Sequence, residues 1–289
     1  MLHEILIAPF AEFDFMRRAL VGTTALALGA GPVGVFLMLR RMSLVGDAMA
    51  HAILPGAAVG FLVAGLNLFA MTAGGLIAGV VVAVLAGIVA RTTELKEDAS
   101  LAAFFLISLA VGVTIVSIKG TNVDLLHFLF GSVLALDDET LLLIASIATV
   151  SLLVLALIYR PLVLECVDPG FLRSGGPAGR PRPRGPGGGG GGNGGGGLGA
   201  LGTLLAVGLM MLPAVIARFW ARDVTAMIAI AIVGGALAGA AGLLLSFHAR
   251  IPSGPAIILI AGGLYAVSVL FGRVGGLVRQ SMPRRHLEA

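Results

Sequence analysis

An acid and a histidine stand inside the long apolar stretch at residues 40–61. Asp47 and His51 are four residues apart, so on a helix both side chains project from the same face, one turn from each other. A carboxylate within a membrane span costs roughly 2.5–3.5 kcal/mol on insertion scales. A carboxylate and a neutral imidazole are also suitable ligands for a divalent transition metal. The pair is therefore the candidate metal site of this chain.

A purely structural role is the alternative for this pair. Asp47 would lie in the first helical turn after Ser43, where a carboxylate interacts favourably with the positive end of the helix. His51 could hydrogen-bond a backbone carbonyl in the core. The residues alone leave both roles open, although ionisable residues inside membrane spans usually serve function. The two ligand types do not separate zinc from manganese.

The composition places these residues in an integral membrane protein. Of the 289 residues, 58% are hydrophobic and 12% are charged, whereas soluble domains carry about 25% charged residues. Several apolar runs reach the roughly 20 residues that a transmembrane helix needs. The single cysteine, Cys166, excludes an internal disulfide and a cysteine-based metal cluster.

The apolar runs predict an all-α polytopic fold of about eight or nine transmembrane helices, in a single domain over residues 1–289. The apolar residues 125–136 are too few to cross a bilayer, which predicts a re-entrant or interfacial helix there. A short mixed segment, 160–176, follows the fifth span. The spans are expected at 15–39, 43–65, 69–90, 101–118, 141–159, 198–219, 224–247 and 255–271.

Basic loop residues set the expected orientation by the positive-inside rule. The acidic cluster Asp137, Asp138 and Glu139 then falls outside, and Arg17, Arg18 and Arg250 are the exceptions to the rule. This topology needs one further crossing before Leu198, which would make nine spans. The segments placed in the cytoplasm are 40–41, 91–97, 160–173, 218–222 and the C-terminal tail.

The residues available for this ninth crossing have the wrong composition. Residues 177–197 read PAGRPRPRGPGGGGGGNGGGG, and glycine and proline at this density neither hold a helix nor bury a core. Read literally, the tract is a flexible linker in place of an expected span. We hypothesise instead two compensating frameshifts in a GC-rich gene, because these would keep the length of a span while replacing its composition.

Four separated motifs resemble one family, the permeases of ATP-binding-cassette (ABC) importers of zinc, manganese and iron. RRMSLVGDAMAHAILPG (40–56) resembles the second-span motif of this family, and VDLLHFLFGSVLAL (123–136) resembles its re-entrant segment. LGTLLAVGLMMLPAVIARFWAR (201–222) resembles its L-P-A-x-x-A-R span, and IPSGPAIILIAGGLYAVSVL (251–270) resembles its final helix. The motifs follow the family's order and cover nearly the whole chain.

The resemblance implies an importer that moves zinc, manganese or iron into the cytoplasm by alternating access. The chain would be the multi-pass permease in the bacterial cytoplasmic membrane and no enzyme, with ATP hydrolysed on a separate cytoplasmic ATPase. It would bind no permanent cofactor, because Zn²⁺ or Mn²⁺ would be its cargo. An extracytoplasmic metal-binding protein would deliver the metal to a homodimer embedded in membrane lipid, and nucleic acid would play no part.

The same resemblance assigns roles to individual residues. Asp47 and His51 would correspond to the metal-contacting acid and histidine of the family's second span, giving four ligands across a two-fold dimer axis. Residues 161–175 would form a short coupling helix, whose apolar side chains fill a groove of the ATPase and whose charged side chains meet its rim. The residues expected to act in coupling are Leu162, Leu164, Glu165, Asp168, Phe171 and Arg173.

Other functions stay open from the sequence. The same architecture could carry a metal chelate or an organic cargo, although Asp47 and His51 argue against a wide, apolar pathway. An ion-coupled secondary transporter would be supported by a repeated half of the chain, which the sequence does not show. The glycine tract keeps a non-transporting scaffold open as well. Three further residues, Asp124, His127 and His248, are weaker candidates for metal ligands than for ordinary cap and surface positions.

Overall fold

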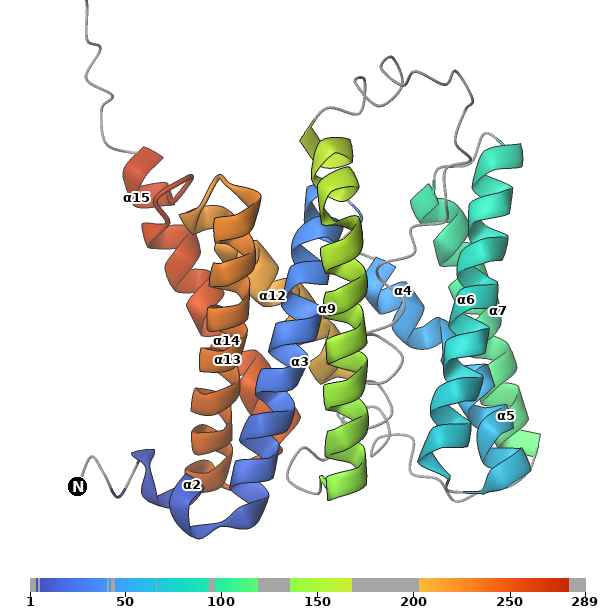
Figure 1. Ribbon diagram of the computed structural model, residues 1–289, viewed down its shortest axis with the longest axis horizontal. Coiled ribbons are helices and arrows are strands. Elements are labelled where there is room, and N and C mark those ends of the chain that lie inside the picture. Colours follow the sequence, from blue (N-terminus) through green and yellow to red (C-terminus); the bar gives the residue numbers. More distant parts are fainter. Residues whose placement is uncertain are drawn as a thin grey trace, which may run out of the picture.

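The computed structural model describes Glu4, Met42 and residues 6–40, 45–65, 67–93, 97–118, 136–167 and 203–280. Within this part of the chain every regular element is a helix, as the sequence predicts (Figure 1). The helices are α2 (Ala8–Glu12), α3 (Asp14–Leu39), α4 (Val45–Ala52), α5 (Leu54–Ala64), α6 (Leu68–Thr92), α7 (Glu97–Ile118), α9 (Asp138–Val167), α12 (Thr203–Trp220), α13 (Val224–Ala249), α14 (Ser253–Phe271) and α15 (Leu277–Gln280).

Six of the helical segments are long and apolar enough to cross a membrane, and two shorter apolar helices, Ala99–Ile115 and Leu205–Trp220, lie among them. Together they follow the eight predicted spans in order. The second span is divided into α4 and α5 at Ile53, two residues before Pro55. The fifth span differs most, because α9 continues through Pro161 to Val167 instead of ending near Tyr159.

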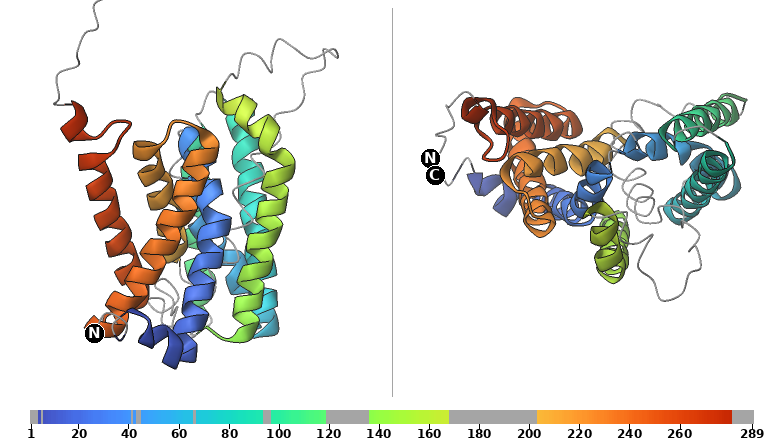
Figure 2. Two further views of the ribbon diagram at one scale, coloured as in Figure 1. Left: turned by 60° about the vertical axis from the view of Figure 1, so that its left-hand side comes forward. Right: turned by 90° about the horizontal axis from the view of Figure 1, so that it is seen from above.

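The helices form two groups that α4 connects (Figures 1 and 2). The first group contains α3, α9, α12, α13 and α14, and the second contains α5, α6 and α7. Helix α4 packs against α6 and α7 of the second group and against α12 of the first. Figure 1 shows α4 between the groups, near the mid-height of the long helices.

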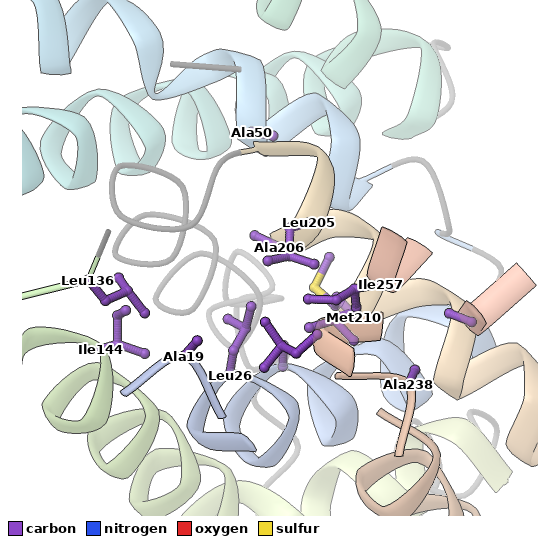
Figure 3. Close-up of a cluster of buried hydrophobic side chains, with 14 of the residues drawn as sticks. Ala19, Leu26, Ala50, Leu136, Ile144, Leu205, Ala206, Met210, Ala238 and Ile257 are labelled. Carbon is purple, nitrogen blue, oxygen red and sulfur yellow. The ribbon is translucent and has the colours of Figure 1, made fainter. Parts of the chain in front are cut away.

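Small residues allow the helices of the first group to approach one another closely. A Cβ added at Gly34 of α3 would collide with the carbonyl oxygen of Met210 in α12. Packing of this kind holds membrane helices together, because lipid offers no hydrophobic driving force between them. Figure 3 shows Ala50 of α4 in one cluster of buried side chains with Leu205 and Ala206 of α12.

Small residues also allow close helix packing in the second group. On α5, Gly56 and Gly60 are four residues apart and face Gly74 and Ala70 of α6, where an added Cβ would meet backbone atoms. This is a small-xxx-small contact between two antiparallel helices. It makes α5 and α6 a closely packed pair beside α4.

Contacts at both ends show that α3 and α9 run in the same direction. Arg18 pairs with Asp138 at their first turns, and the rings of Phe36 and Tyr159 meet edge to face, 6.0 Å apart, toward their last turns. The last turns of α9 therefore lie with the last turns of α3. In Figure 1 both helices end at the upper side of the molecule.

The same reasoning places the beginning of α12 away from the end at which α9 finishes. Gly208 packs on Ile258 near the first turns of α12 and α14, and α14 begins just after α13 ends. Phe247, at the end of α13, contacts Phe13 beside the first turn of α3. Val167 and Thr203 therefore do not lie at the same end of the molecule, and the further crossing between them stays a prediction. Residues 168–202, including most of the glycine tract, lie outside the described residues.

Two of the three exceptions to the positive-inside rule have carboxylate partners. Arg17 pairs with Asp14, one turn earlier on α3, and Arg18 pairs with Asp138 of α9. Both arginines lie at the end of the molecule predicted to be outside. Because their charges are balanced locally, they do not oppose the predicted orientation.

Candidate metal site

Helix α4 is buried on every side except one. Between Gly46 and Ala52, every residue is buried apart from Asp47 and His51, which share one face at i and i+4. The side chain of Asp47 is 59% exposed and that of His51 is 24% exposed. The only open stripe of this short helix thus carries the two residues singled out in the sequence.

The two side chains are close enough to bind one cation together. The Nε2 atom of His51 lies 3.8 Å from Oδ1 of Asp47. Bonds from nitrogen or oxygen to a borderline divalent metal measure about 2.0–2.2 Å, so two donors on one ion can be up to about 4.2 Å apart. Small rotamer changes would therefore let both atoms contact the same ion.

The surroundings of His51 do not match the structural alternative. Its Nδ1 atom is buried and has no hydrogen-bond partner in the part of the chain that the structure describes, so no described backbone carbonyl accepts a bond from it. The imidazole instead stacks on the ring of Phe105 in α7, with 6.0 Å between ring centroids and 27° between planes. Asp47 does lie in the first turn of α4, where the helix end favours its charge.

Contacts with three helices hold α4 in place. An added Cβ at Gly46 would collide with the methyl carbon of Met210 in α12, so α4 and α12 approach closely at this point. Ser108 of α7 is buried, and its hydroxyl donates a hydrogen bond of 2.9 Å to the carbonyl oxygen of Ala52. The Cε atom of Met49 would lie 3.4 Å from a Cβ added at Gly79 of α6.

The pair alone is an incomplete coordination sphere. Among the described residues, no group of three His, Cys, Asp or Glu side chains could hold a metal ion. Further ligands would have to come from water, from a second copy of the chain or from other segments. Two weaker candidates from the sequence, Asp124 and His127, lie outside the described residues.

The other acidic and histidine candidates have structural partners. Asp137 caps α9, because its Oδ1 accepts a hydrogen bond of 3.0 Å from the backbone N–H of Thr140. Hydrogen bonds from the Thr140 side chain and backbone lower the pKa of Asp137 below its usual value of 3.8. Near the end of α13, Nδ1 of His248 lies 2.9 Å from the carbonyl oxygen of Leu244. Both residues lie at helix ends, and for His248 this agrees with the cap or surface position expected from the sequence.

The predicted coupling residues are only partly described. Leu162 is half-buried and Leu164 is exposed on the last turns of α9. Glu165 belongs to the same helix. Because α9 is continuous, these residues extend the fifth span instead of starting a separate helix. The remaining predicted coupling residues, Asp168, Phe171 and Arg173, lie outside the described residues.

Sequence reasoning missed the residues around the pair. Phe105, Ser108 and Met210 lie in uniformly apolar runs, where nothing distinguishes them from lipid-facing or core positions. Their importance follows only from the contact of α4 with α7 and α12. A single sequence carries no signal for such contacts between distant segments.

A family comparison covers most of the chain. The ABC 3 transport family matches residues 12–176 and 196–272. The unmatched interval, 177–195, lies within the glycine- and proline-rich tract. The two matched segments include all four motifs and both residues of the candidate site.

Relatives with stated functions match over nearly their full lengths. The manganese import system permease protein ScaB of Streptococcus parasanguinis is 31% identical over 89% of this chain and 90% of its own length. The chelated iron transport system membrane protein YfeD of Yersinia pestis is 28% identical over 95% of this chain and 91% of its own length. The solved structure of PsaBC from Streptococcus pneumoniae in complex with Fab has a TM-score of 0.80 and 25% identity, and covers 98% of this chain and 100% of that chain.

Proposed function

Because the chain belongs to the ABC 3 transport family, the multi-pass permeases of metal importers in the bacterial inner membrane, we propose that its cargo is manganese. The permease is not itself an enzyme, since ATP is hydrolysed on a separate ATPase subunit. Manganese is favoured over zinc and iron because several relatives are named manganese permeases. The residues themselves are compatible with any of these metals.

The observation that carries the site proposal is the open stripe of α4. A carboxylate exposed near the mid-height of a membrane protein is costly unless it faces water, a cation or another protein surface. Asp47 and His51 lie on the only unburied side of a helix that is otherwise enclosed. We therefore assign these two residues to contact with the transported ion.

An incomplete ligand set suits transport, because a cargo that is held by a full cage of protein ligands leaves slowly. Asp47 and His51 supply two donors, and a second copy of the chain across a two-fold axis would supply two more. This arrangement makes the active permease a homodimer. The metal would then be bound briefly between two α4 helices.

The arrangement of the helices supports alternating access. Helix α4 touches α12 of the first group and α6 and α7 of the second, so a shift between the groups would change what faces the metal pair. The continuous helix α9 leads from the predicted outer end to Leu162 and Leu164, where the ATPase would dock. An extracytoplasmic metal-binding protein would deliver the ion at the opposite end.

One alternative cargo has a specific observation in its favour. The relative YfeD is named for chelated iron, so iron or an iron chelate is the second candidate. A secondary transporter would not require the ATPase partner that this family uses. The single permease domain over residues 1–289 suffices for either cargo.

The test is uptake of radiolabelled Mn²⁺, Zn²⁺ and Fe²⁺ by cells that co-express the chain with the ATPase and binding protein encoded beside it. Asp47→Ala and His51→Ala are expected to reduce ATP-dependent Mn²⁺ uptake to background at an unchanged membrane level. Glu12→Ala and His248→Ala are the matched controls, because they remove an exposed acid and an exposed histidine elsewhere. Unchanged Mn²⁺ uptake in both site variants would refute the assignment.

A further inference from the structure

We propose that α7 positions the His51 imidazole for metal binding, through the ring of Phe105 and the hydroxyl of Ser108. The inference rests on the proposed metal role of His51. It adds two residues that contact no metal themselves: Phe105 contacts the imidazole of His51, and Ser108 binds the backbone of the next residue, Ala52. Both come from a helix that carries none of the predicted ligands.

The ring of Phe105 limits how the imidazole can rotate. The two ring centroids lie 6.0 Å apart with 27° between the ring planes, and Nδ1 of His51 is buried and has no hydrogen-bond partner among the described residues. A metal-binding histidine is usually oriented by a hydrogen bond from its second ring nitrogen to a carboxylate or carbonyl. In the described residues His51 has no such partner at Nδ1. Stacking on Phe105 is the contact that can take over this role.

Ser108 fixes the backbone next to the histidine. Pro55 has no N–H, so the carbonyl oxygen of His51 loses the donor that a continuous helix would place four residues later. Helix α4 also ends one residue after His51, at Ala52. The hydroxyl of Ser108 donates to the carbonyl oxygen of Ala52 at 2.9 Å. This bond ties the last turn of α4 to α7, where the helix is interrupted.

The two contacts act from one face of α7. Phe105 and Ser108 are three residues apart, so they are neighbours on the helix surface. One holds the side chain of His51 and the other holds the end of its helix. With both in place, Nε2 of His51 stays 3.8 Å from Oδ1 of Asp47, a separation that one ion can bridge.

The chain offers matched controls for both residues. Phe104 is the preceding residue of α7, is also half-buried and projects from another face of the helix. Ser100 is buried on the same helix, and its hydroxyl also donates at 2.9 Å to a backbone carbonyl of another helix, that of Ala86 in α6. Truncating Phe104 or Ser100 therefore repeats the loss of packing or of a buried hydrogen bond without affecting His51.

The experiment measures Mn²⁺ on the purified transporter complex by pulsed electron paramagnetic resonance, in which a coordinated imidazole produces nitrogen modulation of the signal. Uptake kinetics are measured in parallel. Phe105→Ala and Ser108→Ala are expected to weaken the nitrogen modulation and to raise the KM for Mn²⁺ about 10-fold, since supporting residues of metal ligands typically affect affinity by this factor. The maximal rate stays near that of the wild type. Three control variants are expected to keep both the nitrogen modulation and the KM of the wild type: Phe105→Tyr, Phe104→Ala and Ser100→Ala.

The outcomes separate the two proposals. If His51→Ala removes the nitrogen modulation while Phe105→Ala and Ser108→Ala leave both readouts unchanged, the positioning role is refuted and the metal site stands. If His51→Ala leaves the modulation of the wild type intact, the metal role of His51 fails and the positioning role fails with it. Equal loss in Phe104→Ala and Phe105→Ala would show a general packing defect and would also refute the positioning role.

Discussion

Arg18 and Asp138 form a two-point ion pair across 120 residues of sequence. The Nε atom of Arg18 lies 3.1 Å from Oδ1 of Asp138, and its Nη2 atom lies 3.3 Å from Oδ2. The pair joins the first turns of α3 and α9. It explains how an arginine is accommodated at the end of the molecule that is predicted to face outward.

Breaking this pair is expected to have a small effect on stability, because both side chains are largely exposed. A double-mutant cycle with Arg18→Ala and Asp138→Ala should give a coupling free energy of about 0.2–1 kcal/mol that shrinks as salt is added. Thermal unfolding of the purified permease at two ionic strengths measures it. The same cycle with Glu139→Ala in place of Asp138→Ala is the control, and an equally large coupling there would contradict the specific pair.

Replacing Gly34 by alanine should disturb the contact of α3 with α12. The new Cβ would collide with the backbone carbonyl of Met210, which cannot move aside as a flexible side chain can. Overpacking of this kind costs about 1–3 kcal/mol, so the melting temperature should fall. Gly262→Ala is the matched control, because nothing lies within 4 Å of a Cβ added there. Equal melting temperatures for the two variants would rule out this close approach.

The capping role of Asp137 should depend on pH. Its pKa is lowered in the folded state by the Thr140 side chain and then by the Thr140 backbone N–H. A lowered folded pKa means that the ionised group stabilises the fold above the unfolded pKa, and that this contribution is lost as pH falls through the folded pKa. The difference in melting temperature between wild type and Asp137→Ala should therefore be constant near neutral pH. It should shrink as the pH falls below 3.8, the usual pKa of this carboxyl. A difference that persists unchanged in strong acid would contradict this.

The direction of the helices makes a prediction about sidedness. Cys166 is the only cysteine of the chain and lies in the last turn of α9. It should react with a membrane-impermeant thiol reagent only from the cytoplasmic side. In a Cys166→Ser background, Asn67→Cys, at the opposite end between α5 and α6, should react only from outside. Labelling of both positions from the same side would refute the topology.

The same topology predicts what the gene should encode between α9 and α12. Because Val167 and Thr203 do not lie at the same end of the molecule, we expect a crossing where the sequence reads as glycine and proline. Resequencing the codons for 177–197 is expected to restore an apolar segment in a shifted frame. The identical codons in frame would refute the frameshift hypothesis and would leave a permease with a linker in that place.

The spans could be predicted from the sequence because a bilayer imposes a simple rule of length and hydropathy. Asp47 and His51 stand out in the sequence because they break that rule within one span, and their role as metal ligands stays a prediction. The continuity of α9 through Pro161 could not be predicted from the sequence, since a proline there is equally compatible with the end of a helix. The proposed roles of Phe105 and Ser108 could not be predicted either, because they depend on how α7 packs against α4.

Both proposed ligands belong to a single helix of eight residues. Whatever the two helix groups do, the spacing of Asp47 and His51 along that helix is preserved. As long as this helix stays intact, a transport cycle cannot release its ion by separating the two backbone positions. The affinity would then change through the rotamers of the two side chains, which α7 restrains, and through the ligands that complete the coordination sphere from the side facing α4.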